Sequence, residues 1–199
     1  MEVAVADYGV GNLFSISKGL EAAGAKTRIV PDMVALLDAD CIVLPGVGAF
    51  GAAMGALRPV LPKLRTRISS GVPTLGICLG MQLLFDRSEE SSGAGLSVLS
   101  GEVRRLKIGR IPQMGWNNVE WVEDELFDCV PETSQFYFAN SYVCHPAEDI
   151  GIATTDYGER FASAVRDDAI VGVQFHPEKS GSPGLKLLSN FISIAEEAQ

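Results

Sequence analysis

The stretch PTLGICLGMQLLF, Pro73–Phe85, predicts a strand, a sharp bend and a helix. Thr74–Ile77 is short and apolar, and the residues after the bend return to apolar side chains at a spacing compatible with a helix. Cys78 stands on the bend, with Gly76 and Gly80 two residues to either side. This G-x-C-x-G spacing is that of a nucleophile elbow in which sulfur replaces oxygen.

The position of Cys78 favours chemistry, although a structural role stays open. Glycines let a strand and a helix approach closely at a strained turn, which directs the side chain between them outward. A thiol at a helix N-terminus also lies near free N–H groups and the positive end of the helix dipole, which stabilise the reactive thiolate. A lone cysteine in an apolar segment is commonly a buried structural residue, so other parts of the chain must decide.

Upstream of the bend, short apolar strands alternate with helices. Val3–Ala6 is typical of a strand, and the turn Tyr8–Gly11 and a helix that Gly24 ends follow it. The next expected elements are a strand at Thr27–Val30, a short helix at Met33–Leu37 and a buried strand at Cys41–Leu44. Such alternation predicts an α/β fold with a mostly parallel, twisted sheet and helices on both faces, whose ligands bind beyond the carboxyl ends of the strands. We expect a single domain over residues 1–199.

The pattern changes after Phe85. Ser88–Gly95 contains glutamates, serines and glycines and is expected to be a loop. Short strand-like segments then predict an added antiparallel region in the second half, made of Val103–Leu106, Asn118–Trp121, Gln135–Phe138, Tyr142–Cys144, Ile152–Thr154, Ala162–Arg166 and Ile170–Phe175. An amphipathic helix is expected over Leu185–Ala198.

Composition and charge exclude several classes of protein. The 199 residues are 47% hydrophobic, enough for one substantial core, and their net charge of −9 opposes binding to nucleic acid. No apolar run approaches the roughly 18 residues of a membrane span. The first residues do not resemble a signal peptide, so we expect a cytoplasmic protein. The four cysteines lack C-x-x-C spacing, so neither a disulfide framework nor a structural zinc site is indicated.

A cysteine nucleophile needs a base and a group that orients the base. Of the two histidines, His176 follows the apolar strand IVGVQF and precedes Glu178 by two residues, which places both side chains on one side of an extended chain. Pro177 favours that extended conformation of His176. His145 has only Glu148 nearby and is the weaker candidate. A solvated turn remains the alternative interpretation of the His176 motif.

A third feature is the loop PGVGAFG, Pro45–Gly51, directly after the Cys41–Leu44 strand. Backbone N–H groups of glycine-rich loops after parallel strands commonly bind anions, and the oxyanion of an acyl transfer is such an anion. A plain turn would explain this loop alone. Cys78, His176 and the loop nevertheless all lie at predicted carboxyl ends of strands, where one site could unite them.

These motifs carry a resemblance to a known family. The segments GICLGMQ around Cys78, PGVG in the loop and HPEKS around His176 resemble the class I glutamine amidotransferases, whose fold is flavodoxin-like and whose catalytic triad is Cys, His and Glu. Three further segments are similar to the glutaminase subunits of imidazole glycerol phosphate synthases: DYGVGNL near the start, PQMGWNNV from Pro112 and YFANSYV from Tyr137. The resemblance spans Asp7–Ser180.

The resemblance implies roles for individual residues. Cys78 would attack the side-chain amide of glutamine, and His176, oriented by Glu178, would accept the thiol proton and protonate the departing ammonia. Water would then hydrolyse the glutamyl thioester to glutamate. The implied oxyanion hole comprises Val47, Gly48 and Leu79, and the implied substrate contacts are Gly48, Gln82, Ser141 and Tyr142. Neither a cofactor nor a metal is implied.

The resemblance also implies a partner, a (βα)8-barrel cyclase subunit that uses the ammonia to make imidazole glycerol phosphate and an aminoimidazole carboxamide ribonucleotide in histidine biosynthesis. The matching positions of the heterodimer interface are Asn12, Met114, Trp116, Tyr137 and Lys179. It further implies an allosteric switch, in which the oxyanion loop forms fully only when the partner binds. At Asn140 the chain departs from the family, which commonly has histidine there, so a role of that position in catalysis or signalling is in question.

Several alternatives stay open at this point. One is a glutaminase subunit for pyridoxal phosphate or aminodeoxychorismate synthesis, although the former group normally has a GGES-type loop in place of PGVG. Another is a non-catalytic regulatory module, which the intact Cys78, His176 and Glu178 disfavour. A thiol hydrolase acting on peptides is a further option. Trp116 could also belong to the core of the chain instead of an interface.

Overall fold

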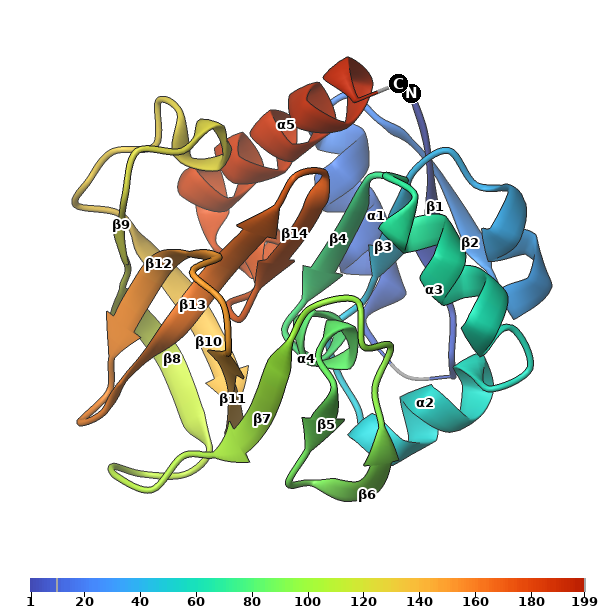
Figure 1. The fold of residues 1–199 in the computed structure, drawn as a ribbon. Coiled ribbons are helices and arrows are strands. Elements are labelled where there is room, and N and C mark those ends of the chain that lie inside the picture. Colours follow the sequence, from blue (N-terminus) through green and yellow to red (C-terminus); the bar gives the residue numbers. More distant parts are fainter. Residues whose placement is uncertain (10, 199) are drawn as a thin grey trace.

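A parallel sheet forms the centre of the molecule in this computed structural model, which describes residues 1–9 and 11–198. The parallel strands are β1 (Glu2–Ala6), β2 (Lys26–Val30), β3 (Ile42–Leu44), β4 (Thr74–Ile77) and β14 (Ile170–Val173). They lie side by side in the order β2-β1-β3-β4-β14 (Figure 1). The expected α/β architecture with a mostly parallel sheet is therefore confirmed.

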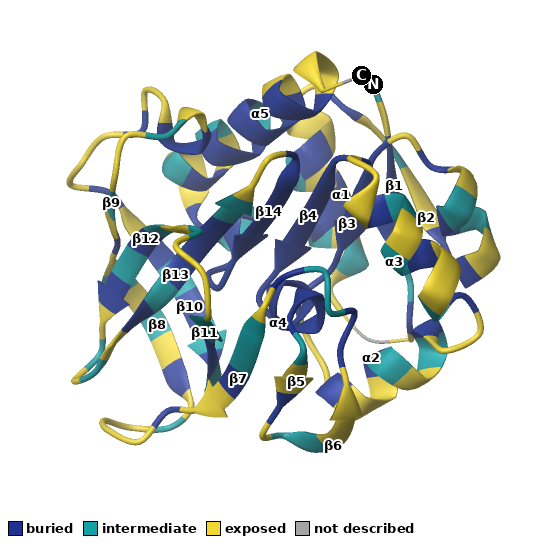
Figure 2. Ribbon diagram, viewed as in Figure 1, coloured by how far each residue is buried: buried dark blue, intermediate teal, exposed yellow. Residues whose placement is uncertain are grey.

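Helices cover both faces of this sheet (Figure 1). On one face lie α1 (Leu13–Ala22) and α5 (Gly181–Glu197), and on the other lie α2 (Phe50–Leu57), α3 (Leu61–Ser69) and α4 (Leu79–Leu84). The alternation of side chains along β1 explains the arrangement. Val3 and Val5 pack in the apolar cluster of α1 and α5, whereas Ala4 and Ala6 pack in the cluster of α2, α3 and α4. The central strands between the two clusters are buried on both faces (Figure 2).

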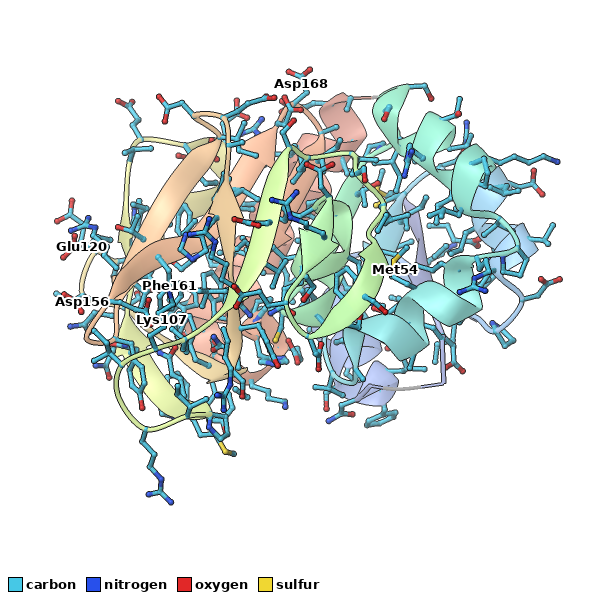
Figure 3. All side chains as sticks on the ribbon, turned by 60° about the horizontal axis from the view of Figure 1, so that its bottom comes forward. Met54, Lys107, Glu120, Asp156, Phe161 and Asp168 are labelled. Atoms are coloured by element: carbon cyan, nitrogen blue, oxygen red, sulfur yellow. The ribbon has the colours of Figure 1, made fainter. Side chains whose placement is uncertain are left out.

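The sheet continues beyond β14 as the expected antiparallel region. Its strands are β5 (Arg87–Ser88), β6 (Ser91–Ala94), β7 (Gly101–Arg105), β9 (Glu120–Trp121), β11 (Tyr142–Pro146), β12 (Gly151–Asp156) and β13 (Arg160–Asp167). β13 pairs antiparallel with β14, β12 and β11, while β5 runs parallel to β7. Figure 3 shows Glu120, Asp156 and Phe161 on this region, across the molecule from Met54 of α2.

A separate two-stranded sheet is formed by β8 (Gln113–Asn118) and β10 (Gln135–Asn140). Its antiparallel register places Trp116 opposite Tyr137 and Gln113 opposite Asn140. The backbone N–H of His176 donates to the Tyr137 carbonyl at 2.8 Å. This small sheet therefore lies directly against the segment that follows β14.

Two expectations about individual segments were wrong, and a third was right only in part. Ile170–Phe175, expected in the antiparallel region, contains β14, which pairs antiparallel with β13 as expected but also pairs parallel with β4, so this strand joins the two parts of the sheet. Ser88–Gly95, expected to be a loop, contains β6 and the end of β5, since pairing at the sheet edge outweighs the weak strand preference of serine and glycine. Asn118–Trp121 is divided between β8 and β9, which pair in different sheets.

Short 3-10 segments complete the described chain: η1 (Met33–Asp38), η2 (Glu125–Phe127) and η3 (Pro177–Lys179). The expected short helix at Met33–Leu37 is thus a 3-10 helix. Val10, in the expected turn Tyr8–Gly11, lies outside the described residues. None of the described helices combines the length and the apolarity that crossing a membrane requires.

Candidate active site

Cys78 lies in a sharp bend between β4 and α4. Its φ is +50°, and its backbone N–H donates to the Val173 carbonyl of β14 at 2.7 Å. Two residues before and two residues after Cys78, only glycine fits. A Cβ on Gly76 would lie 2.6 Å from the backbone of α4, and a Cβ on Gly80 would lie 1.9 Å from the Leu44 oxygen of β3. The G-x-C-x-G pattern therefore reflects backbone contacts that leave no room for side chains.

The glycine-rich loop after β3 passes beside this bend. A Cβ on Gly46 would meet the Ile77 carbonyl oxygen at 2.5 Å and the Cys78 Cβ at 3.2 Å. Gly48 has a φ of +129°, a conformation that favours glycine. The loop therefore runs close to the backbone and Cβ of the Cys78 bend.

The three expected oxyanion donors lie around the bend. Leu79 is the first residue of α4, so its N–H has no partner within the helix. Val47 and Gly48 belong to the neighbouring loop. The Tyr8 hydroxyl donates to the Pro45 carbonyl, which ties the start of that loop to the segment after β1. The loop and the start of α4 are thus the two elements near Cys78 that carry the expected donors.

His176 and Glu178 form a buried pair at the start of η3. Imidazole Nδ1 lies 2.9 Å from carboxylate Oε1, and each side chain is 1% exposed. His176 is extended and Pro177 begins the 3-10 turn, as their order in the sequence predicts. Because Nδ1 faces Glu178, Nε2 is available to another group. Nε2 makes no hydrogen bond of standard geometry among the described residues, yet the Cys78 sulfur lies near enough to act on the pKa of the ring.

The charge state of His176 follows from its neighbours. Burial alone lowers the pKa of His176, but hydrogen bonding and charge from Cys78 and Glu178 outweigh burial and raise the pKa to about 9. The imidazole is therefore protonated at neutral pH, and an imidazolium stabilises a thiolate beside it. Burial, followed by the charge of Cys78, raises the pKa of Tyr8 well above its ordinary value. The Tyr8 hydroxyl thus keeps its proton.

Of the expected substrate residues, Gln82 of α4 and Tyr142 of β11 are in direct contact. Nε2 of Gln82 donates to the Tyr142 carbonyl at 3.1 Å. Ser141 links β10 to β11. Asn140, the position at which the family commonly has histidine, is buried and donates from Nδ2 to the same Tyr142 carbonyl at 3.2 Å. Gly48, the fourth expected substrate contact, lies in the loop after β3.

Two side chains at the site were not predicted from the sequence. Gln174 is fully buried, and its Nε2 donates to the Cys78 sulfur at 3.4 Å. The sequence feature that could have revealed it is that Gln174 is the one polar residue in the otherwise apolar strand IVGVQF. Glu90 accepts from the Phe50 N–H at 2.9 Å, where the end of the glycine-rich loop becomes the start of α2. No local signal marks Glu90, because the contact joins residues 40 positions apart.

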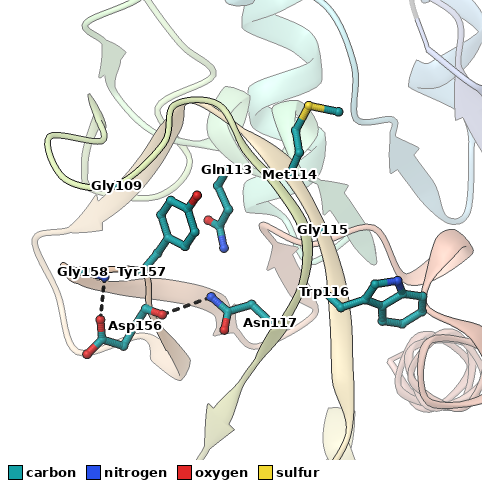
Figure 4. A pocket seen from close by; sticks show the side chains of 9 residues that line it. All are labelled: Gly109, Gln113, Met114, Gly115, Trp116, Asn117, Asp156, Tyr157 and Gly158. Atoms are coloured by element: carbon teal, nitrogen blue, oxygen red, sulfur yellow. Dashed lines mark hydrogen bonds between the residues drawn. The ribbon is translucent and has the colours of Figure 1, made fainter.

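Four of the five expected interface residues lie on or beside the two-stranded sheet. The rings of Trp116 and Tyr137 meet edge to face at 6.1 Å, and Lys179 Nζ lies 5.8 Å from the centre of the Tyr137 ring. Met114 is 68% exposed and Trp116 54% exposed, so Trp116 is not a core residue. Figure 4 shows that Met114 and Trp116 extend from the side of β8 opposite to Gln113. We call Met114, Trp116, Tyr137 and Lys179 the aromatic cluster.

Asn12, the fifth expected interface residue, stands at the start of α1. Its Oδ1 accepts from the Ser15 N–H at 3.2 Å and thereby caps the helix. The same helix packs on η3, where a Cβ on Gly19 would lie 3.5 Å from the Glu178 Cβ. One helix therefore connects Asn12 to the buried histidine–glutamate pair.

The remaining sulfur and imidazole groups are placed differently. His145 lies on β11 opposite Glu102 of β7, and burial lowers its pKa. All four cysteines are free. Within the described part of the chain, no cluster of three or more His, Cys, Asp or Glu side chains could hold a metal ion. Around Cys78 the structure places a thiol, an imidazole bonded to a carboxylate, and the first N–H of α4, which are groups that an acyl transfer can use.

Comparisons with known proteins agree with this chemistry. The family model "Glutamine amidotransferase class-I" matches residues 4–195. The chain is 45% identical over 194 residues to the "Imidazole glycerol phosphate synthase subunit HisH" of Methanothermobacter thermautotrophicus, which covers 96% of this chain and 98% of the relative. It is 46% identical over 205 residues to the protein of the same name from Aquifex aeolicus, with 99% of each covered.

A solved crystal structure of a glutamine amidotransferase matches with a TM-score of 0.79 and 20% identity over 98% of each chain, which supports the fold. The chain therefore belongs to the class-I glutamine amidotransferase family and, within it, to the group of HisH subunits of imidazole glycerol phosphate synthase.

Proposed function

We propose that the chain hydrolyses glutamine to glutamate and ammonia through Cys78, His176 and Glu178. The observation that carries this proposal is the position of the His176 ring, which bonds Glu178 at 2.9 Å through Nδ1 and has a pKa raised by Cys78 on its other side. A base held between a nucleophile and an orienting carboxylate is the arrangement that acyl transfer requires.

The proposed reaction begins with attack of the Cys78 sulfur on the side-chain amide carbon of glutamine. Backbone N–H groups of Leu79 and the Val47–Gly48 loop stabilise the oxyanion that forms, and one such donor typically contributes about 3 kcal/mol. His176 protonates the leaving nitrogen, ammonia departs and a glutamyl thioester remains. Water, deprotonated by His176, then hydrolyses the thioester, releases glutamate and restores the thiol.

We further propose that Gly48, Gln82, Ser141 and Tyr142 hold the glutamine. Gln82 and Tyr142 support this assignment because the Gln82 amide is already fixed by the Tyr142 carbonyl beside the bend. A preorganised amide costs less ordering when substrate binds than a mobile one does.

The proposed partner is a (βα)8-barrel cyclase that receives the ammonia for histidine biosynthesis. The relatives are named as subunits of a synthase, so each of them works as part of an assembly. On this chain, the exposed aromatic cluster and Asn12 are the proposed contact surface. Large exposed side chains such as Met114 and Trp116 are enriched at protein interfaces. A cytoplasmic location stays a prediction.

The decisive experiment measures glutamate release from glutamine by the purified chain, alone and with the barrel cyclase and its nucleotide ligand. Low activity alone that rises strongly with both additions supports the proposal. Cys78→Ala, which removes the nucleophile, is expected to abolish glutamate release while cyclase binding persists. Glutaminase activity that survives Cys78→Ala would refute the assignment. Activation by a different synthase, and not by the cyclase, would move the chain to another amidotransferase pathway.

A further inference from the structure

Gln174 is a buried amide directly beside the proposed nucleophile. It follows β14 and precedes His176 by two residues, so an extended chain directs both side chains to the same side. Its backbone N–H donates to the Ser163 carbonyl of β13 at 2.9 Å, which continues the strand pairing up to this residue. Its side chain is 0% exposed. Strand pairing therefore fixes the backbone from which Gln174 and His176 both reach Cys78.

The side chain of Gln174 is bonded at both ends. Its Nε2 lies 3.4 Å from the Cys78 sulfur, and its Oε1 accepts from Gln82 Nε2 at 3.2 Å. Gln82 Nε2 also donates to the Tyr142 carbonyl at 3.1 Å. Three side chains and one carbonyl thus form a continuous line that ends at the sulfur.

This line determines which end of the Gln174 amide faces Cys78. A backbone carbonyl can only accept, so Tyr142 requires the NH2 end of Gln82. That NH2 group can only donate, so it requires the oxygen end of Gln174. The NH2 end of Gln174 must then point at the sulfur. A reversed amide would bring two donors together at Gln82 and would place an oxygen lone pair against the sulfur.

We propose that Gln174 is a fourth catalytic residue, which donates a hydrogen bond to the Cys78 sulfur and stabilises its thiolate form. This inference rests on the proposed function, in which Cys78 is the nucleophile. Hydrogen bonds to a charged acceptor are stronger than those to a neutral one, so the Gln174 N–H favours the thiolate over the thiol. An amide cannot take up the thiol proton, so Gln174 leaves proton transfer to His176.

The first test measures the reactivity of Cys78 with iodoacetamide between pH 5 and 10, followed by peptide mass spectrometry. The protein carries Cys129→Ser, because Cys129 is the exposed cysteine and would react as well. Gln174→Met keeps the length of the side chain but removes the donor. We expect the midpoint of the alkylation profile to rise by about one pH unit, which is a tenfold loss of thiolate below the midpoint.

Gln113→Met is the matched control, since Gln113 is also buried but lines a different cavity, of about 450 Å³, together with residues of β8 and Tyr157 (Figure 4). It is expected to leave the alkylation profile unchanged. If Gln174→Met does not fold, Gln174→Leu is a smaller apolar change that also removes the donor to sulfur without adding a charge, so the midpoint should again rise. A profile that stays at the wild-type midpoint in the folded Gln174 variant, or that moves equally in Gln113→Met, overturns the proposal.

A purely structural role of Gln174, as a support for Gln82, would give a different result. It would raise KM for glutamine in the cyclase complex and leave the alkylation profile unmoved. A direct role lowers kcat about tenfold and moves the profile. Alkylation needs neither glutamine nor cyclase, so the role of Gln174 is decided even if the wild-type chain releases no glutamate with any partner, a result that would refute the proposed function alone.

Discussion

The bend around Cys78 and the two-stranded sheet β8–β10 differ in how closely the rest of the chain packs against them. At the bend, backbone contacts exclude any side chain at Gly76 and Gly80, and the buried Gln174 is bonded at both ends. On the small sheet, Trp116 is largely exposed, and neither polar atom of the buried Gln113 amide has a partner among the described residues.

The difference indicates that the chain by itself holds the bend in place, whereas the exposed surface of the small sheet is suited to contact with another molecule. A proposed catalytic bend gains from rigid surroundings, because each group must be held in place before substrate arrives. An exposed aromatic surface gains nothing alone and becomes favourable only when a partner covers it. The comparison predicts severe effects of substitutions at the bend and mild effects on the folding of the isolated chain at the small sheet.

Loss of the carboxylate behind the histidine is expected to have the largest effect. Glu178→Gln keeps the shape but removes the charge that orients His176, and we expect kcat for glutamine hydrolysis to fall about 10³- to 10⁴-fold. The measurement is glutamate release in the cyclase complex. Glu196→Gln is the control and should retain activity, because Glu196 is an exposed glutamate that pairs with the N-terminal ammonium group of Met1. A loss of less than tenfold in Glu178→Gln would show that the carboxylate does not orient the base.

Gly80→Ala tests the contact between α4 and β3. The added Cβ would lie 1.9 Å from the Leu44 oxygen, and we expect the free energy of unfolding to fall by at least about 3 kcal/mol. Urea unfolding measures the change. Gly55→Ala is the control, because no atom lies within 4 Å of a Cβ at that position in α2. It should raise stability by about 0.5–1 kcal/mol, and an equal loss in both variants would contradict the proposed cause.

The stability of the His176–Glu178 pair depends on pH. A pKa raised to about 9 means that the folded chain binds the proton more tightly than the unfolded chain does, whose histidine keeps its ordinary pKa near 6.5. This stabilisation is fully present below pH 6.5 and is lost as the pH rises through 9. The difference in unfolding free energy between wild type and His176→Gln should therefore shrink by roughly 3 kcal/mol from pH 6 to 10. A constant difference across this range would show that the ring is not charged in the folded chain.

Trp116→Ala tests whether the aromatic cluster serves a partner. We expect cyclase binding to weaken at least about tenfold, while the free energy of unfolding changes by less than about 0.5 kcal/mol. Calorimetric titration and urea unfolding provide the two values. Val122→Ala, which removes another exposed apolar side chain outside the cluster, should change neither. Large destabilisation by Trp116→Ala would mean that the indole belongs to the fold after all.

The smallest expected effect concerns the unpaired amide of the small sheet. Gln113→Leu removes a buried group without partners, and we expect unfolding to require about 1 kcal/mol more. Asn190→Leu is the contrasting variant, since Asn190 Nδ2 donates to the carbonyls of Leu126 and Asp128 at 3.0 and 2.8 Å. That change should destabilise by about 1–3 kcal/mol. Similar losses in both variants would reveal that Gln113 is satisfied by a bound molecule.

Local patterns in the sequence were sufficient to predict the bend and the histidine–glutamate pair. The glycines around Cys78 and the proline between His176 and Glu178 act through backbone geometry over a few residues, so their effect can be predicted without the fold. The roles that these residues take in catalysis stay predictions until they are measured.

Contacts between distant segments could not be predicted in this way. β14 joins the parallel sheet only because β4, about 96 positions earlier, provides its partner. Glu90 reaches the Phe50 N–H from a segment that looked like a loop. The direction of the Gln174 amide depends on Gln82 and on the Tyr142 carbonyl, which come from two other elements. In each case the deciding partner is absent from the local sequence.

The central sheet also divides the apolar interior into two compartments. Phe191 lies in the cluster under α1 and α5, and Leu64 lies in the cluster under α2, α3 and α4. Side chains around a cavity made at either position would shift only within the same compartment. The losses in unfolding free energy from two cavities on opposite sides of the sheet should therefore add, whereas those from two cavities within one compartment should not. The two halves of the interior can therefore accumulate sequence changes independently, and a defect under one layer of helices leaves the other layer intact.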